Sequence, residues 1–363
     1  MAQESLSSAK NEKYDEYYTR MVDIENELSQ YDFKLFKNKV IYCNCDDPTW
    51  SNFFKFFVKW GKRLDIKEAR FTNYANKKRQ LKQLTLFEPD DLIESAKDDK
   101  KGIAHYWVYK PATGKIIKKV LKGDGNFKSD ECIKFLKQAD IVVTNPPFSL
   151  FKEYVEQLVE YDKKFLILGN PNSITYKEMF KLIRDDKVWL GYKSLGTDTY
   201  FKITAKHREK LVQEKKEGSA YVIRDGEVLG RTMACWFTNL DLLKRHKPMV
   251  LHNQDLSQLC KYDNYDAIEI PKVKMIPDNY YGVMGVPITF LDKYCPDQFE
   301  IIGTADSKEN LPGMKVLGKA FIDGYRAQGG TGHYSINMYG VSLIQDGKYK
   351  IVFKRIFIKR KKV

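Results

Sequence analysis

The residues best suited to chemistry form a four-residue turn, Asn145-Pro146-Pro147-Phe148, directly after the apolar run 140–144. The side-chain oxygen of Asn145 and the backbone carbonyl of Pro146 can accept hydrogen bonds from both hydrogens of an amino group. Two prolines stiffen the turn, and Phe148 offers a flat face to an aromatic ring. Such a turn suits methyl transfer to a conjugated amine and needs no general base of high pKa. These residues alone do not distinguish adenine N6, cytosine N4 and a protein glutamine amide.

The elements that must position this turn alternate between strand and helix. Short apolar runs bounded by turn residues indicate strands, and amphipathic stretches of about ten residues indicate helices between them. This alternation favours right-handed crossovers and hence an α/β fold with a doubly wound, mostly parallel sheet. The expected strands are 39–44, 68–74, 140–144, 164–168 and 188–191, and the expected helices are 53–60, 129–138, 150–161 and 176–185.

The pattern changes near residue 241, where helical periodicity fades and turn residues multiply. A chain of 363 residues commonly forms more than one compact unit. We therefore expect one domain over 1–240 and a C-terminal region of strands and loops over 241–363. Residues 76–122 are less regular and are interpreted as an insertion that contains a hairpin, 104–109 with 115–121. A second hairpin is expected through Asp225-Gly226.

The chain is basic, with 62 Lys and Arg residues against 48 Asp and Glu residues and a formal net charge of +14. This excess favours a polyanionic partner, although charge alone does not separate DNA, RNA and a membrane surface. The six cysteines and five histidines are scattered, without zinc spacing, so we expect reduced thiols and no metal. Without a secretory signal or a long apolar run, we expect a cytoplasmic protein with no membrane span.

Long strings of residues, distributed nearly end to end, match one family of enzymes. The matching stretches are 15–19, 23–28, 42–48, 51–55, 140–150, 161–165, 172–178, 238–241, 262–268 and 282–291. Through them the chain resembles the EcoRI-type adenine-N6 DNA modification methyltransferases, and the resemblance thins across 76–122, 192–230 and 303–350. It implies a Rossmann-like class I fold that transfers methyl from S-adenosylmethionine to adenine N6 in a specific sequence of double-stranded DNA. It also implies restriction-modification beside a cognate endonuclease, with an orphan or phage-protective role equally compatible.

The fold and the family together imply a cofactor pocket, because ligands of doubly wound sheets bind at the carboxyl ends of strands. In the family, the segment after the first strand holds the methionine end of S-adenosylmethionine, and an upstream Tyr-Thr motif covers it. The turn 123–127 should meet the cofactor adenine. This chain lacks the commoner glycine-rich loop after its first strand, and its second strand ends without a carboxylate for the ribose. The implied cofactor-binding residues are Tyr18, Thr19, Asn44, Cys45, Asp46, Asp47, Pro48, Asp124 or Asn126, Phe127 and Asn145.

An adenine within a duplex must be extruded from the stack before its N6 can react. We expect Phe148 to stack on one face of the base. Phe201 is the candidate for the other face, with a place in the core as its alternative. The order of the motifs resembles the gamma arrangement, in which target recognition lies C-terminal. The candidates for contacts to DNA, with a solvated surface as the alternative for each, are Lys244, Arg245, His246, Arg326 and Gln328.

Two other classes of function are also compatible with the sequence. The same turn could serve an RNA-adenine or protein-glutamine methyltransferase, which substrate competition would distinguish. A DNA-binding module that has lost catalysis is the second alternative. The intact turn at 145–148 argues against that module.

Overall fold

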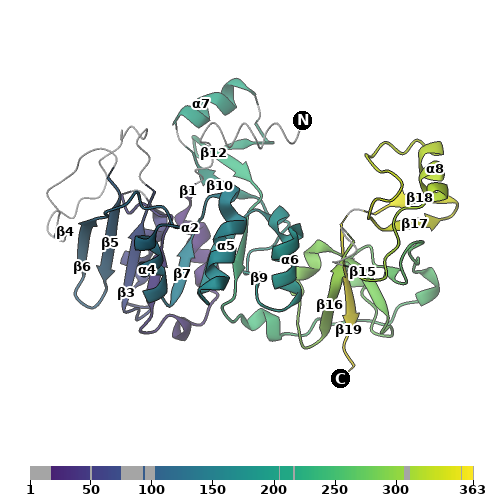
Figure 1. Cartoon of the computed structure of the whole chain (residues 1–363), viewed down its shortest axis with the longest axis horizontal. Helices are drawn as coiled ribbons and strands as arrows, with labels where there is room; N and C mark the ends of the chain where they lie inside the picture. Colours follow the sequence, from purple (N-terminus) through teal and green to yellow (C-terminus); the bar gives the residue numbers. More distant parts are fainter. Residues whose placement is uncertain are drawn as a thin grey trace. The chain divides into compact units, whose positions relative to one another are not determined.

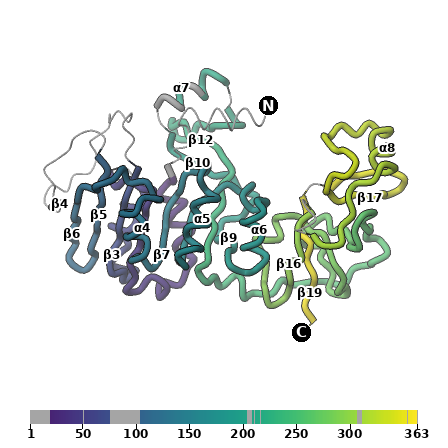
Figure 2. Tube along the Cα trace, in the orientation of Figure 1, coloured from purple at the N-terminus to yellow at the C-terminus, as the bar shows by residue number. Residues whose placement is uncertain are grey.

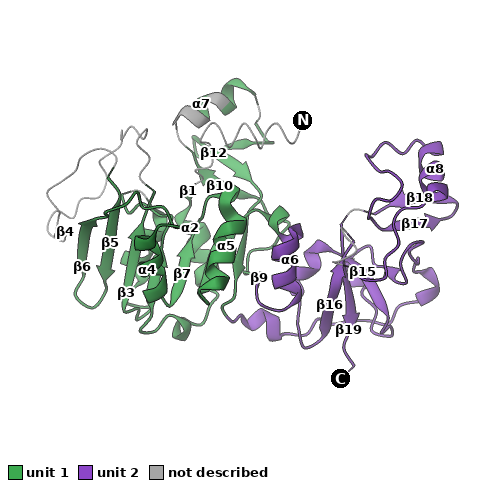
Figure 3. Ribbon diagram, viewed as in Figure 1, with its two compact units in different colours: residues 1–173, 190–240 green, residues 174–189, 241–363 purple. Residues whose placement is uncertain are grey.

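The computed structural model describes residues 18–49, 51–74, 93–94, 103–203, 205–215, 217–305, 311–352 and 354–362. They form two compact units, which we describe separately (Figure 3). The first unit holds the described residues of 1–173 and 190–240, and the second those of 174–189 and 241–363. One boundary thus falls between Leu240 and Asp241. The placement of 174–189 in the second unit has no counterpart in the sequence pattern, which simply continues the alternation of strand and helix there.

The central sheet of the first unit has, within the described residues, nine strands in the order β4-β6-β5-β3-β2-β7-β8-β13-β9 (Figure 1). At its centre, β3, β2, β7 and β8 run parallel. Every residue of β2 and β7 is buried, as expected for parallel strands covered on both faces. The predicted α/β architecture with parallel strands is therefore confirmed. The strands are β2 (Val40–Cys43), β3 (Glu68–Thr72), β4 (Ile93–Glu94), β5 (His105–Lys110), β6 (Lys115–Val120), β7 (Ile141–Thr144), β8 (Lys164–Gly169), β9 (Trp189–Leu190) and β13 (Cys235–Thr238).

Helices link the parallel strands, as the spacing predicts. Ser51 is the N-cap of α3, and its hydroxyl accepts hydrogen bonds from the backbone N–H groups of Phe53 and Phe54. The helix α4 packs against β2, α5 packs against β8, and α2 packs against α3. Packing of these helices thus fixes the loops that join them to the strands at the edge of the sheet. The helices are α2 (Met21–Leu28), α3 (Asn52–Trp60), α4 (Asp130–Gln138) and α5 (Phe151–Glu160).

The hairpin expected within 76–122 is present, and it extends the central sheet. β5 pairs antiparallel with β3 on one side and with β6 on the other. The hairpin therefore belongs to the sheet itself. The remainder of the expected insertion falls largely on 76–92 and 95–102, which lie outside the described residues.

A smaller sheet completes the first unit, in the order β1-β10-β12-β11. The expected hairpin through Asp225 and Gly226 is confirmed, because β11 and β12 pair antiparallel and both turn residues have positive φ, 51° and 76°. The short β1 pairs antiparallel with β10. This pairing ties the N-terminal Tyr-Thr motif to a strand far along the chain. The elements are β1 (Tyr18–Thr19), β10 (Thr199–Lys202), β11 (Tyr221–Arg224), β12 (Glu227–Thr232) and the helix α7 (Ala205–Gln213).

The second unit is mostly strand and loop, as predicted, but it also contains two helices within its described residues. Its larger sheet has the order β14-β15-β19-β16, so the C-terminal strand β19 returns between β15 and β16. Figure 2 shows β19 beside β16. The helix α6 packs against β16, and α8 against β18. The elements are α6 (Lys177–Arg184), β14 (Ile268–Glu269), β15 (Val283–Pro287), β16 (Phe299–Thr304), α8 (Lys319–Ala327), β17 (Ser342–Gln345), β18 (Lys348–Ile351) and β19 (Arg355–Arg360).

Candidate active site

The turn at 145–148 lies at the carboxyl end of β7, between the ends of β2 and β8 in the sheet. Thr144 closes β7 and is fully buried, and Pro146 is buried behind it. Pro147 has φ −57° and ψ 125° and leads into a 3-10 turn, Phe148–Leu150, which continues directly into α5. The rigid proline geometry thus holds the carbonyl of Pro146 between a buried strand and a helix start. Phe148 remains partly exposed.

Asp46, in the loop after β2, is a buried carboxylate that joins two strand ends. Its Oδ2 accepts a hydrogen bond from the Thr144 hydroxyl at 2.5 Å, and its Oδ1 accepts one from the Ser51 hydroxyl at 2.9 Å. The backbone N–H of Asn145 also donates to this carboxylate. Burial raises the pKa of Asp46 to about 7, and these three hydrogen bonds act in the opposite direction.

Two buried polar atoms near this loop have no hydrogen-bond partner among the residues that the structure describes. They are Nδ2 of Asn44, at the end of β2, and Oγ1 of Thr19, in β1. The hydroxyl of Tyr154 on α5 donates to Oδ1 of Asn44, which fixes the orientation of that amide. Asn52 donates from Nδ2 to the carbonyl of Thr19 at 2.8 Å. A buried donor without a partner costs about 1–3 kcal/mol, so these atoms suit a polar ligand.

The loops after β2 and β3 meet the glycine-rich turn 123–127. The Nδ2 of Asn73 donates to Oδ2 of Asp47 at 2.9 Å. Gly125 has a φ of 75°, and a Cβ there would overlap the carbonyl oxygen of Asn73. A side chain is therefore excluded at position 125 by both backbone conformation and space. Three loops, after β2, after β3 and before α4, thus converge at one edge of the sheet.

The turn 123–127 is itself held by polar side chains. Oδ1 of Asp124 accepts from the backbone N–H of Asn126, and Oδ1 of Asn126 accepts from that of Lys128, both at 2.9 Å. Phe127 is buried, with its ring in an edge-to-face contact with Tyr154 at 5.1 Å between centroids. Tyr154 therefore contacts both Phe127 and Asn44. Nothing in the sequence pattern separates it from other core aromatics of α5, and it was not among the predicted site residues.

Comparison with known proteins identifies the family of this chain. The model of the family described as adenine-specific methyltransferase EcoRI matches residues 5–361. The type II methyltransferase M.EcoRI of Escherichia coli is 45% identical over 306 residues, which cover 82% of this chain and 88% of the relative. The type II methyltransferases M.MgeORF184P of Mycoplasma genitalium and M.MpnI of Mycoplasma pneumoniae are each 36% identical, over 82% of this chain and 85% and 84% of the relatives.

The chain belongs to the family of adenine-specific methyltransferases. The resemblance carried by the matching stretches is therefore confirmed. No solved structure matches the chain.

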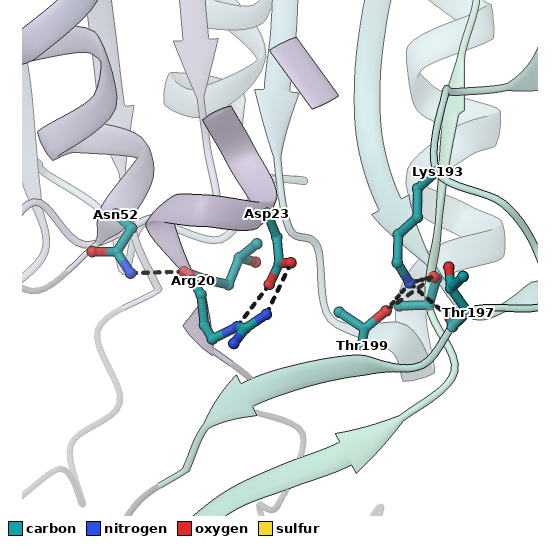
Figure 4. A network of polar contacts seen from close by, with 8 residues as sticks. Arg20, Asp23, Asn52, Lys193, Thr197 and Thr199 are labelled. Atoms are coloured by element: carbon teal, nitrogen blue, oxygen red, sulfur yellow. Dashed lines mark hydrogen bonds and ion pairs between the residues drawn. The ribbon is translucent and has the colours of Figure 1, made fainter. Parts of the chain in front are cut away.

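In this methyltransferase a polar network fixes β1 and the chain around it, which the sequence pattern does not predict (Figure 4). Lys193 donates from Nζ to the carbonyls of Thr197 at 3.0 Å and Ala234 at 2.8 Å, and to the Thr199 hydroxyl. Burial lowers the pKa of Lys193. Because Thr199 begins β10 and β10 pairs with β1, this ammonium helps to hold the strand that carries Thr19. Of Tyr18 the structure describes only the backbone.

The expectation that Phe201 stacks on the base is wrong for this conformation of the methyltransferase. Phe201 lies in β10 opposite Thr19 of β1 and Gly230 of β12, and its exposed fraction is 0%. A base therefore cannot reach its ring without displacing the strand. The alternative interpretation, a core aromatic, fits the observed burial.

Arg245 does not have the exposed position expected of a DNA contact. Its guanidinium pairs with Asp186 and lies over the ring of Trp189, 3.7 Å from the centroid, and its side chain is only 7% exposed. This arginine therefore stabilises the second unit. His246 is exposed and contacts Asp241 at 2.7 Å, and Lys244 is half-buried.

Arg326 and Gln328 also make contacts within the second unit that their predicted role does not include. The Arg326 guanidinium donates to three carbonyls of the following loop, those of Gly330, Gly332 and Tyr334, at 2.7–3.0 Å. The Gln328 amide makes two hydrogen bonds with the β17–β18 hairpin. Its nitrogen donates to the carbonyl of Gly347, and its oxygen accepts from the backbone N–H of Tyr349. These hydrogen bonds organise the loop after α8, and both side chains are exposed, so contact of Arg326 and Gln328 with DNA stays a prediction.

Among the described residues, no group of three or more His, Cys, Asp or Glu side chains could hold a metal ion. Cys45 follows Asn44 in the loop after β2, and burial, together with the charge of Asp46, raises the pKa of its thiol. Cys45 is therefore a neutral thiol beside the site. In the part of the chain that the structure describes, no helix has the length and apolar character needed to cross a bilayer.

Proposed function

We propose that this enzyme is a site-specific DNA methyltransferase that transfers the methyl group of S-adenosylmethionine to N6 of an adenine extruded from double-stranded DNA. One observation carries the proposal: the turn 145–148 leaves the buried strand β7 beside the loop after β2, and Asn44 at the end of β2 and Thr19 of β1 hold buried polar atoms without hydrogen-bond partners among the described residues. A turn whose two oxygens can accept both hydrogens of an amino group thus lies beside buried polar atoms that suit a polar cofactor. The parallel centre of the sheet supports a Rossmann-like class I fold.

In the proposed reaction, the protein makes the amino nitrogen more nucleophilic and holds it in one orientation. The side-chain oxygen of Asn145 and the carbonyl of Pro146 accept the two N6 hydrogens, which draws the nitrogen toward tetrahedral geometry and frees its lone pair. Phe148 stacks on the purine and offsets the cost of extrusion, which is about a few kcal/mol. The rigid prolines keep the acceptors in place, so the gain is one of orientation. After transfer, the amine loses one proton to solvent.

The cofactor would supply an activated methyl group on a sulfonium, and the residues present fit such a ligand. Nδ2 of Asn44 and Oγ1 of Thr19 are available to an amino-acid end. Phe127 and the turn with Asp124 and Asn126 lie on the other side of the loop after β2, where an adenine would meet them. Tyr18, Cys45, Asp47 and Pro48 belong to the same two segments and complete the proposed pocket, with Asn145 at its border to the base.

We assign two regions of the chain separate tasks under this proposal. The region 1–240 would carry catalysis, and 241–363 would recognise the target sequence. Lys244, His246, Arg326 and Gln328 stay candidates for contacts with DNA, since Lys244 is half-buried and the other three are exposed. Because the relatives are named type II methyltransferases, restriction-modification in the cytoplasm, beside a cognate endonuclease, is the proposed setting.

The test is transfer of a labelled methyl group from S-adenosylmethionine to duplex DNA in competition with RNA and protein. Asn145→Ala should lower the rate of transfer to DNA on the order of 100-fold or more, with DNA affinity largely kept. The matched control is Asn239→Ala, which removes an amide that bonds the backbone of Phe165 and Lys163 elsewhere in the unit and should leave the rate unchanged. Label in RNA or protein but not in DNA would replace the proposal by the corresponding alternative. Unchanged turnover of Asn145→Ala would remove Asn145 from its role.

A further inference from the structure

The carboxylate of Asp46 accepts three hydrogen bonds from the protein itself. Ser51 donates to one carboxylate oxygen, Thr144 donates to the other, and the backbone N–H of Asn145 adds a third hydrogen bond. The residue is 5% exposed. Its acceptor capacity is therefore directed toward two loops of the chain, whereas Asn44 and Thr19 have buried polar atoms without partners among the described residues.

The donors on Asp46 come from segments with different tasks in the proposed reaction. Thr144 and Asn145 belong to β7 and the turn that holds the base, and Thr144 lies 98 residues further along the chain. Ser51 belongs to the loop after β2, where the cofactor would bind. Because one small, buried carboxylate bonds both segments, it helps to set their relative position.

Two of the three hydrogen bonds to Asp46 have a fixed direction. The Ser51 hydroxyl accepts from the backbone N–H of Phe53 as the N-cap of α3, so its own hydrogen is free to point at Asp46. The backbone N–H of Asn145 can only donate. An ionised carboxylate satisfies all of these donors at once, and charge-assisted hydrogen bonds are shorter and stronger than neutral ones. The 2.5 Å contact from Thr144 fits this description.

We propose that Asp46 is a positioning residue, which couples the catalytic turn to the cofactor loop by holding Thr144 and the backbone of Asn145, and that it does not bind the cofactor. This inference rests on the proposed function and revises the expected role of Asp46. Methyl transfer requires the amine and the methyl donor to be aligned, and a misplacement of about 1 Å can lower a rate about 100-fold. The hydrogen bonds of Asp46 to Thr144 and Asn145 help to maintain that alignment.

The test uses the full-length enzyme and a pair of variants at Thr144. Thr144→Val keeps the shape of the side chain but removes the hydroxyl that Asp46 accepts. It should lower the single-turnover rate of methyl transfer about 10- to 100-fold at saturating substrates, with the dissociation constants for S-adenosylmethionine and DNA changed less than about threefold. Thr144→Ser keeps the hydroxyl and should restore a rate within about threefold of the wild type.

The matched control is Thr238→Val. Thr238 is also a fully buried threonine that ends a strand of the same sheet, and its hydroxyl donates to the carbonyl of Phe165 at 2.6 Å. Its loss should lower the melting temperature without lowering the single-turnover rate. A rate loss shared by Thr144→Val and Thr238→Val would mean that the effect is general destabilisation, and the inference would be overturned.

Four further results decide the inference. A wild-type rate in Thr144→Val overturns it, and so does a rate in Thr144→Ser as low as that in Thr144→Val. If Asp46→Asn loses affinity for the cofactor but keeps the rate of methyl transfer, Asp46 is a cofactor-binding residue after all. If Asp46→Asn has a lowered rate and an unchanged affinity, the positioning role is supported. This second result also decides the inference if Thr144→Val does not fold. The wild-type assay separates the two proposals, because absence of methyl transfer to DNA by the wild type contradicts the proposed function itself.

Discussion

Asp46→Asn should alter the pH dependence of stability in a defined direction. Burial raises the pKa of Asp46 from 3.8 to about 7 in the folded protein, against the hydrogen bonds from Thr144, Ser51 and Asn145. In the unfolded chain the carboxyl ionises near its ordinary pKa of about 3.9. Between these two values the folded state holds a proton that the unfolded state has lost. The wild type therefore loses stability as the pH rises from about 4 to about 7. Above that range, the contribution of Asp46 to stability no longer changes with pH.

The magnitude follows from the two pKa values. Each pKa unit is worth about 1.4 kcal/mol, so the difference corresponds to about 4 kcal/mol once the carboxyl is ionised in both states. About 2 to 3 kcal/mol of it falls between pH 5 and pH 8. Asparagine does not titrate, so the Asp46→Asn variant lacks this pH dependence of stability. The variant also loses hydrogen bonds that the carboxylate accepts, and this loss lowers its stability by a similar amount at every pH. The other titratable groups around the carboxyl, present in both proteins, are Cys43, Cys45, Asp47 and Tyr154.

The assay is urea unfolding of wild type and variant at several pH values between 5 and 8, with the free energy of unfolding extrapolated to water. The variant should gain stability relative to the wild type by about 2 to 3 kcal/mol across this range. The matched control is Asp346→Asn, because Asp346 is exposed in the β17–β18 turn with a φ of 52° that asparagine also adopts readily. A difference between wild type and Asp46→Asn that stays constant with pH would refute the reasoning.

Three further predictions concern the base and the second unit. Phe148→Ala should weaken stacking of the extruded base, and 2-aminopurine at the target position should then show a changed fluorescence on binding; identical signals would count against stacking. Arg245→Ala should lower the free energy of unfolding of the second unit by about 1–3 kcal/mol, because it removes a buried guanidinium, its ion pair with the more exposed Asp186 and its contact with Trp189. Lys244→Ala should instead weaken DNA binding in a salt-dependent manner, and a loss of affinity in Arg245→Ala without a loss of stability would contradict this assignment.

The turn at 145–148 and the strands around it could be predicted from sequence because their signals are local. A buried parallel strand reads as a continuous apolar run, and β2 and β7 do so. The Asp225-Gly226 turn has the residues that its two positive φ angles require. The stretches that match the methyltransferase family supplied the activity, which no periodicity could give.

The errors concern contacts between residues far apart in the chain. Phe201 is buried because β10 pairs with both β1 and β12, and neither pairing leaves a mark on the sequence around it. Arg245 belongs to a basic run that indicates an exposed surface, but its partner Asp186 lies 59 residues earlier. The role inferred for Asp46 depends in the same way on Thr144, 98 residues away. Composition and spacing identify polar candidates but do not tell which of them the fold uses internally.

The central claim is that a two-acceptor turn at the end of β7 holds an adenine for methylation. Its most direct test is single-molecule sequencing of DNA from a host that expresses the wild-type chain, beside DNA from a host that expresses Asn145→Ala. N6-methyladenine in one short sequence context with the wild type, and its absence with the variant at equal protein levels, is the predicted result. Modified cytosine, or N6-methyladenine that persists with Asn145→Ala, would contradict the account.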